Sequence, residues 1–172
     1  MTTRGARGPG PGLGGGSGSQ RGTCPVAPAG NPTLACNIGK VFVIGNGCTL
    51  DFGPRPVTIL GSGTIDLLQN TATIRAASFT VAPSGRVEGR GNGNSAPTDR
   101  GGVLNLITTG AVDIQRIGSQ TARGIVDFAG NARAGSFIVT AGGPISVNGD
   151  IMANNLLPPS GNGVITLRST GG

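Results

Sequence analysis

Residues 104–114 read LNLITTGAVDI, and residues 137–147 read FIVTAGGPISV. A shift of 33 residues brings the apolar side chains of the two stretches into coincidence. The coinciding positions are Leu104 and Phe137, Leu106 and Val139, Gly110 and Gly143, Val112 and Ile145, and Ile114 and Val147. An apolar residue at every second position is the pattern of a β-strand with one buried face. The shared spacing therefore predicts strands that occupy equivalent places in a repeating structure.

Apolar pairs of the same kind recur between residues 42 and 172, and they fall into three series. The first series is Leu50/Phe52, Ala72/Ile74, Leu104/Leu106, Phe137/Val139 and Ile165/Leu167. The second series is Val57/Ile59, Phe79/Val81, Val112/Ile114 and Ile145/Val147. The third series is Phe42/Ile44, Ile65/Leu67, Val87/Gly89, Val126/Phe128 and Ile151/Ala153. Turn-forming residues separate the pairs, so each series predicts one strand position in a repeating turn of chain.

A repeat of three strands and three corners is typical of a parallel β-helix. In that fold, the strands of each turn of chain pair with the strands of the next turn, about 4.8 Å away. We therefore predict an all-β protein, a right-handed parallel β-helix of about five coils. The alternative is an antiparallel β-sandwich, because Asn46-Gly47 and Asn148-Gly149 are typical two-residue hairpin turns. A sandwich, however, gives no reason for apolar pairs to recur at a constant phase.

Composition divides the chain into three segments. The sequence has 172 residues, of which 34 are Gly and 12 are Pro. Residues 1–22 hold nine of these glycines and almost no apolar side chain, so they are predicted to form a disordered tail. Residues 23–41 are predicted to cap the fold, and residues 42–172 to form the β-helix.

Charge and residue usage exclude several classes of function. The formal net charge is +6, but the basic residues are scattered, and Tyr and Trp are missing, so nucleic-acid binding is not expected. No apolar run is long enough to cross a bilayer, and the start, MTTRGARGPG, lacks the apolar segment of a signal peptide. The chain has no His, and its glycine motifs lack the lysine of a phosphate loop. No metal or cofactor is therefore expected.

The three cysteines, Cys24, Cys36 and Cys48, are spaced by twelve residues each time. This is not the spacing of metal ligands. The expected disulfide joins Cys36 to Cys48, and closing that short loop would add about 3 kcal/mol of stability. Cys24 is then free, or else it is the alternative partner of Cys36. The remaining alternative is three reduced thiols.

A row of acidic residues is predicted on the outer surface of the third series. The residue between two inward-facing neighbours on a strand points to solvent, and in this series those residues are Val43, Asp66, Glu88, Asp127 and Met152. Asp66, Glu88 and Asp127 should therefore stack about 5 Å apart, where carboxylates can divide the roles of glycoside hydrolysis or bridge a cation. Asp51 and Asp113 occupy equivalent outward positions on the other series. The three acids are thus weak catalytic candidates, and we expect a protein that is not an enzyme.

Insertions collect at the corner that leads from the third series to the first. The longest connection at this corner has fourteen residues, whereas a connection from the first series to the second never has more than five. Loops on a rigid scaffold often carry binding residues, and Asn and Arg can bond sugar hydroxyls or carboxylates. The candidate ligand-binding residues are Arg90, Asn92, Asn94, Asp99, Arg100, Asn131, Arg133, Asn154 and Asn155.

Several segments resemble a known kind of repeat. GGVLNLITTGAVDI at 101–114, FIVTAGGPISVNGDI at 137–151 and GVITLRSTGG at 163–172 resemble the glycine-rich rungs of long bacterial surface proteins. These are the filamentous-haemagglutinin-like and autotransporter-passenger β-helices. TCPVAPAG at 23–30, followed by LACNIGKVFVIGNGCTLDFG at 34–53, looks like the cysteine-bearing first rung of some of them. The resemblance covers roughly residues 36–172 and implies an extracellular or cell-surface location.

The expected function is a structural or adhesive surface module that displays loops from one corner. Its expected partners are further copies stacked end to end, or further coils of a longer chain, with a polysaccharide or cell-surface glycan as candidate ligand. One alternative is an intracellular, polymer-forming scaffold of the bactofilin type, whose rungs VNGDIMAN at 147–154 resembles; its location would be cytoplasmic. The other alternative is a polysaccharide-acting β-helix enzyme.

Overall fold

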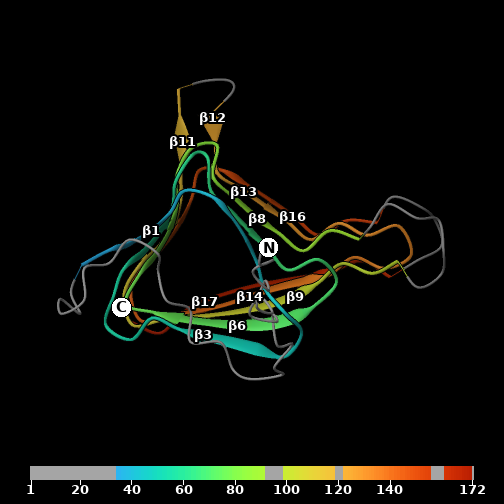
Figure 1. The fold of residues 1–172 in the computed structure, drawn as a ribbon, viewed down its shortest axis with the longest axis horizontal. Coiled ribbons are helices and arrows are strands. Elements are labelled where there is room, and N and C mark those ends of the chain that lie inside the picture. The colour runs from blue at the N-terminus through green and yellow to red at the C-terminus, as the bar shows by residue number, and fades with distance from the viewer. Residues whose placement is uncertain (1–33, 92–98, 119–121, 156–160, 172) are drawn as a thin grey trace, which may run out of the picture.

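The computed structural model describes residues 34–91, 99–118, 122–155 and 161–171. These residues form short β-strands joined by turns and contain no helix. Three five-stranded sheets, named A, B and C here, account for most of the strands. In Figure 1 the three sheets form the sides of a triangle, with sheet C along the bottom.

Each sheet takes one strand from each successive part of the chain. Sheet A contains β1 (Cys36–Ile38), β4 (Val57–Ile59), β7 (Phe79–Val81), β10 (Val112–Ile114) and β15 (Ile145–Val147). Sheet B contains β2 (Val41–Val43), β5 (Thr64–Asp66), β8 (Arg86–Glu88), β13 (Ile125–Asp127) and β16 (Asp150–Met152). Sheet C contains β3 (Cys48–Asp51), β6 (Thr71–Ala76), β9 (Val103–Thr108), β14 (Ser136–Ala141) and β17 (Val164–Ser169).

The chain visits the sheets in a fixed rotation, from A to B to C, and we call each such set of three strands a rung. The first rung is β1–β3, and the fifth is β15–β17. Every strand pair within the three sheets is parallel. The predicted all-β class with parallel, stacked strands is therefore confirmed, and the connectivity is compatible with a parallel β-helix. The alternative of an antiparallel sandwich is wrong.

The strand registers agree with the three apolar series. In sheet B, Ile65 pairs with Val87, and Val87 pairs with Val126. All three side chains are fully buried, because each inward position is covered by its equivalents in the rungs above and below. At the corner between sheets B and C, the rings of Phe128 and Phe137 stack with their centroids 5.8 Å apart. The apolar core is thus one continuous axis through the described rungs.

One register differs from the prediction. The sequence series aligned Leu50 with Ala72, whereas in the structure Leu50 pairs with Ile74 and Cys48 pairs with Ala72. A slip of two residues leaves the same side chains facing inward, so alternation alone cannot detect it. The strand ends at Asp51, whose Oδ1 accepts a hydrogen bond from the backbone N–H of Gly53 at 2.8 Å. That turn places Phe52 beyond the strand.

Both Asn-Gly pairs lie at corners of the triangle, where the chain passes from one sheet to the next. Gly47 adopts a left-handed φ of 72° at the corner between β2 and β3, a conformation that glycine reaches without strain. Asn148 and Gly149 both donate backbone hydrogen bonds to the carbonyl of Ile114, at the corner between β15 and β16. Neither pair forms a hairpin. The antiparallel pair in the described chain is instead β11 (Arg116–Ile117) with β12 (Ala122–Arg123), which projects between β10 and β13 (Figure 1).

The beginning of the described chain bears on the predicted cap segment and on the predicted disulfide. Residues 36–38 form β1 in register with β4, so the stack begins before residue 42, inside the predicted cap segment. Cys36 is disulfide-bonded, while the thiol of Cys48 is free, so the predicted Cys36–Cys48 bridge is wrong. The two residues lie in different sheets, since Cys36 belongs to β1 and Cys48 to β3. Cys24 and the predicted tail lie outside the described residues.

Candidate functional site

The described parts of the insertions between sheets B and C lie together at one corner of the triangle. We call this region the loop corner; its described segments are residues 89–91 and 99–102, 128–135, and 153–155 with 161–163. It extends to the right of the triangle in Figure 1. Isolated parallel bridges join Arg100 to Arg133 and Gly130 to Asn155. The rung-to-rung pairing of the strands therefore continues into the loops, which stack on one another.

A buried carboxylate holds the loops of the corner together. Asp99 is only 1% exposed, and its Oδ1 accepts a hydrogen bond of 3.1 Å from Nε2 of Gln69. The Oδ2 atom accepts a bond of 3.3 Å from the backbone N–H of Asn131. The Asp99 carbonyl also accepts bonds from the N–H groups of Ala132 and Arg133. Asp99 was predicted as a ligand-binding residue, but its burial gives it a structural role inside the corner.

The other predicted ligand-binding residues differ in how exposed their side chains are. Arg90, Arg100, Arg133 and Asn154 are exposed, while Asn131 and Asn155 are partly buried. Arg90 is not free, because its Nε lies 3.1 Å from Oδ2 of Asp127. Arg100 and Arg133 lie next to each other on neighbouring rungs, because a parallel backbone bridge pairs them. Asn92 and Asn94 lie outside the described residues.

The predicted row of acids is present in sheet B. Asp66 pairs with Glu88, and Glu88 pairs with Asp127. Each acid also has a local partner: Asp66 Oδ1 accepts a bond of 2.8 Å from the N–H of Leu68, and Glu88 Oε1 lies 2.7 Å from the guanidinium of Arg86. Asp127 is 5% exposed and accepts a bond from the N–H of Ala129 as well as its ion pair with Arg90. The row therefore presents Asp66 and Glu88 to solvent more than Asp127.

Aspartate recurs at strand ends for a reason that alternation does not reveal. Asp51, Asp66 and Asp127 each end a strand, and each accepts a hydrogen bond from the backbone N–H two residues further on. This arrangement satisfies a donor at the corner and mimics a backbone turn. The local signal in the sequence is an Asp at the last strand position, directly before the corner.

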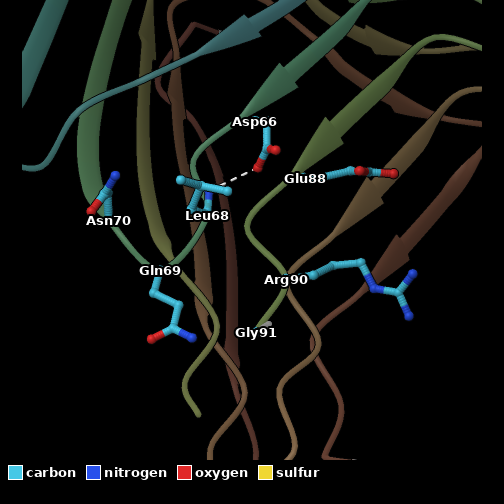
Figure 2. A pocket seen from close by; sticks show the side chains of 7 residues that line it. All are labelled: Asp66, Leu68, Gln69, Asn70, Glu88, Arg90 and Gly91. Carbon is cyan, nitrogen blue, oxygen red and sulfur yellow. Dashed lines mark hydrogen bonds between the residues drawn. The ribbon is translucent and has the colours of Figure 1, made fainter. Parts of the chain in front are cut away.

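A pocket of about 480 Å³ joins the acid row to the loop corner. The residues that line it are Asp66, Leu68, Gln69, Asn70, Glu88, Arg90 and Gly91. In Figure 2, Asp66 and Glu88 come from neighbouring strands, with Gln69 and Asn70 on the connection that follows Asp66. The sequence pattern did not predict Leu68, Gln69, Asn70 or Gly91 as residues of the site. Leu68, Gln69 and Asn70 lie in a connection of ordinary length, so no unusually long loop indicated them.

The pocket is lined by both hydrogen-bond acceptors and donors, because the Arg90 guanidinium lies beside the carboxylates and amides. The Gln69 amide N–H₂ donates to Asp99, and that of Asn70 donates to the carbonyl of Ile44 at 2.9 Å. Their amide oxygens remain as acceptors, together with the second carboxylate oxygens of Asp66 and Glu88. Such a lining can both accept hydrogen bonds from a ligand and donate hydrogen bonds to it.

Protein-family models, curated proteins and solved structures were compared with the chain. None of them matches. The resemblance to surface-protein rungs therefore depends on the sequence segments quoted above.

Two further findings bear on the chemistry of the described residues. Among them, no group of three or more His, Cys, Asp or Glu side chains could hold a metal ion. None of their elements is a helix long and apolar enough to cross a membrane.

Proposed function

We propose that the chain is a right-handed parallel β-helix that works as a structural or adhesive module at the cell surface or outside the cell. It holds the loop corner rigidly and presents it to a polysaccharide that carries carboxylate groups. Its action is passive, because binding requires no movement of the stacked rungs. The three-sheet rotation, the continuous apolar axis and the resemblance of the rungs to surface proteins support this reading.

The observation that carries the proposal is the pair of arginines in the loop corner. Arg100 and Arg133 are exposed and adjacent across a rung, and guanidinium groups bind carboxylates with paired hydrogen bonds. Arg100 directly follows Asp99, which bonds to Gln69 of the pocket. A chain of uronic acid units would thus place its carboxylates on the arginines and its hydroxyls against the polar side chains of the pocket.

The test is a binding measurement on a panel of uronate polysaccharides and neutral glucans. We expect the uronate polysaccharides to bind, and the double change Arg100→Gln with Arg133→Gln to weaken binding by at least about tenfold, since each charge-assisted bond contributes about 1.5–3 kcal/mol. Glu88→Gln should weaken binding less. The matched control is Arg75→Gln, an exposed arginine on the outer face of sheet C.

Two results would contradict the proposal. One is the lack of binding to any member of the panel. The other is uronate binding that the double arginine change leaves as strong as the Arg75→Gln control does. Release of reducing ends in the same samples would favour the alternative of a polysaccharide-acting enzyme, with Asp66 and Glu88 as its acids.

A second candidate is the polymer-forming scaffold of the bactofilin type. The observation that favours it is the set of parallel, stacked rungs, together with the resemblance of residues 147–154 to the rungs of such scaffolds. Under this reading copies would stack into filaments within the cytoplasm. Electron microscopy of the purified chain would reveal such filaments, whereas the surface-module reading predicts short particles.

A further inference from the structure

Asp99 is buried, yet it lies directly before one of the two exposed arginines of the loop corner. Its side chain is 1% exposed, whereas Arg100, the next residue, is exposed. Burial of a carboxylate costs free energy unless hydrogen bonds to its oxygens offset that cost. The hydrogen bonds that reach Asp99 therefore indicate what the buried group holds in place.

Hydrogen bonds reach Asp99, which belongs to the third rung, from the rungs on both sides. From the second rung, Gln69 Nε2 donates to Oδ1 at 3.1 Å. From the fourth rung, the backbone N–H of Asn131 donates to Oδ2 at 3.3 Å. The Asp99 carbonyl accepts bonds from the N–H groups of Ala132 at 3.0 Å and Arg133 at 3.2 Å. Asp99 thus ties together the connections of three successive rungs.

The same bonds set the spacing of the two arginines. Arg100 and Arg133 are joined by a parallel bridge, and such a bridge places the Cα atoms of neighbouring rungs about 4.8 Å apart. One backbone bond of this bridge runs from the N–H of Arg133 to the carbonyl of Asp99, and the other runs from the N–H of Gly101 to the carbonyl of Arg133. The carboxylate of Asp99 supports the bridge because it binds the N–H of Asn131, two residues earlier.

Packing also constrains the carboxylate of Asp99. It lies against the backbone of Gly91, and a methyl group at Gly91 would overlap its oxygens. The N–H of Gly91 donates to the carbonyl of Ala129 at 3.0 Å, which ties the backbone of Gly91 to the fourth rung. A displacement of the carboxylate would therefore disturb its bonds to Gln69 and Asn131.

From these contacts, we propose that Asp99 is the positioning residue of the arginine pair. It holds Arg100 and Arg133 at a spacing that lets both guanidinium groups bind one polysaccharide chain. The inference rests on the proposed function for its ligand, whereas the positioning itself needs no ligand. Loops that are ordered in advance lose less conformational freedom on binding, so Asp99 raises the affinity for uronates without touching them.

The sign of the effect separates positioning from simple electrostatics. Loss of the negative charge of Asp99 makes the corner more positive, which by charge alone strengthens the binding of a polyanion. Loss of positioning weakens it. Asp99→Ala is therefore expected to weaken uronate binding at least about tenfold, and Asp99→Asn, which keeps the size and one acceptor oxygen, to weaken it less.

The matched control for charge is Asp113→Ala. Asp113 lies in β10 between the inward-facing Val112 and Ile114, on the outer face of sheet A. Its replacement changes the net charge by the same amount as Asp99→Ala, far from the bonds of the loop corner. Asp113→Ala is expected to leave uronate binding unchanged or slightly stronger.

A cross-link follows the positions of residues 100 and 133 without any ligand. In a Cys48→Ala background, which removes the free thiol, the changes Arg100→Cys and Arg133→Cys are expected to give an intramolecular disulfide on mild oxidation. Cα atoms about 4.8 Å apart lie within the range of a disulfide. Adding Asp99→Ala should slow the cross-link at least about threefold, because it lowers the effective concentration of one thiol beside the other. Asp113→Ala should not change the rate.

A second variant displaces the carboxylate and keeps every charge. Gly91→Ala forces the Asp99 side chain away from its bonds and is expected to slow the cross-link as Asp99→Ala does. Thermal unfolding of each variant identifies an assay temperature at which the chains are folded, so that a loss of global stability alone does not alter binding or cross-linking. Should Asp99→Ala not fold, Gly91→Ala still tests the positioning.

A combined variant tests whether Asp99 acts through the arginines. Added to the double change Arg100→Gln with Arg133→Gln, Asp99→Ala is expected to cause no further loss of uronate binding, because the groups that it positions are already missing. A further loss would show that Asp99 acts elsewhere and would refute the inference.

Two other results would also overturn it. One is a cross-link rate that neither Asp99→Ala nor Gly91→Ala changes in folded chains. The other is uronate binding that Asp99→Ala leaves unchanged or strengthens. If the unaltered chain binds no uronate but Asp99→Ala slows the cross-link, the proposed function fails and the positioning of residues 100 and 133 by Asp99 stands.

Discussion

Single residues decide how closely successive rungs can approach. Gly102, Gly135 and Gly163 directly precede β9, β14 and β17, and they lie above one another at the loop corner. A methyl group at Gly135 would collide with the carbonyl oxygen of Gly102, and one at Gly163 would collide with the carbonyl oxygen of Gly135. Part of the high glycine content is thus explained by backbone-to-backbone contact, where a Cβ atom has no room.

This contact predicts the effect of a small substitution. Gly135→Ala should lower the free energy of unfolding by about 1–3 kcal/mol, because the added methyl group forces the rungs apart. Thermal unfolding followed by circular dichroism measures the change. Gly161→Ala is the matched control, since nothing lies within 4 Å of a Cβ atom built there, and it should change stability by less than about 0.5 kcal/mol. Equal effects of the two changes would contradict the close-contact explanation.

The sequence predicted some residues of the candidate site better than others. Asp66, Glu88 and Asp127 were placed in one row because alternation and a repeat phase are enough to set register. The partners of these acids could not be predicted, because ion pairs and turn bonds depend on side-chain geometry at the corners. Asp99 shows the same limit: its burial comes from three loops that meet only in the folded chain.

At the scale of strands, the apolar alternation carried most of the information about the fold. It predicted the registers of β5, β8, β13 and β16 within sheet B. It failed at β3, where a slip of two residues keeps the same face inward, and it did not indicate the short antiparallel pair β11–β12. Both failures arise where few inward apolar residues constrain the strand.

Equivalent leucines on different strands allow a direct test of stacking. Leu106 in β9 and Leu167 in β17 share one row through Val139, but Leu106 is fully buried and Leu167 is not. Leu106→Ala should cost about 2–5 kcal/mol of stability, and Leu167→Ala about 1 kcal/mol. Chemical denaturation measures the change in the free energy of unfolding for both variants. Similar costs for the two changes would show that the rows do not form one axis.

At the scale of the whole molecule, the rungs form a nearly one-dimensional stack. Each sheet strand pairs only with its equivalents in the rungs before and after it, so stability is expected to depend mainly on contacts between neighbouring rungs. The fifth rung has a neighbour on one side only, and its inward side chains are partly exposed. The stack should therefore open first at this end.

Hydrogen exchange of the native chain tests this gradient. At low protein concentration, the amides of β17 should exchange at least about tenfold faster than those of β9 in the third rung, because local opening of the last rung breaks the contacts of one neighbour and not two. Uniform exchange along the stack would mean that the described rungs open together as one cooperative unit. The one-dimensional account of the fold would then be wrong.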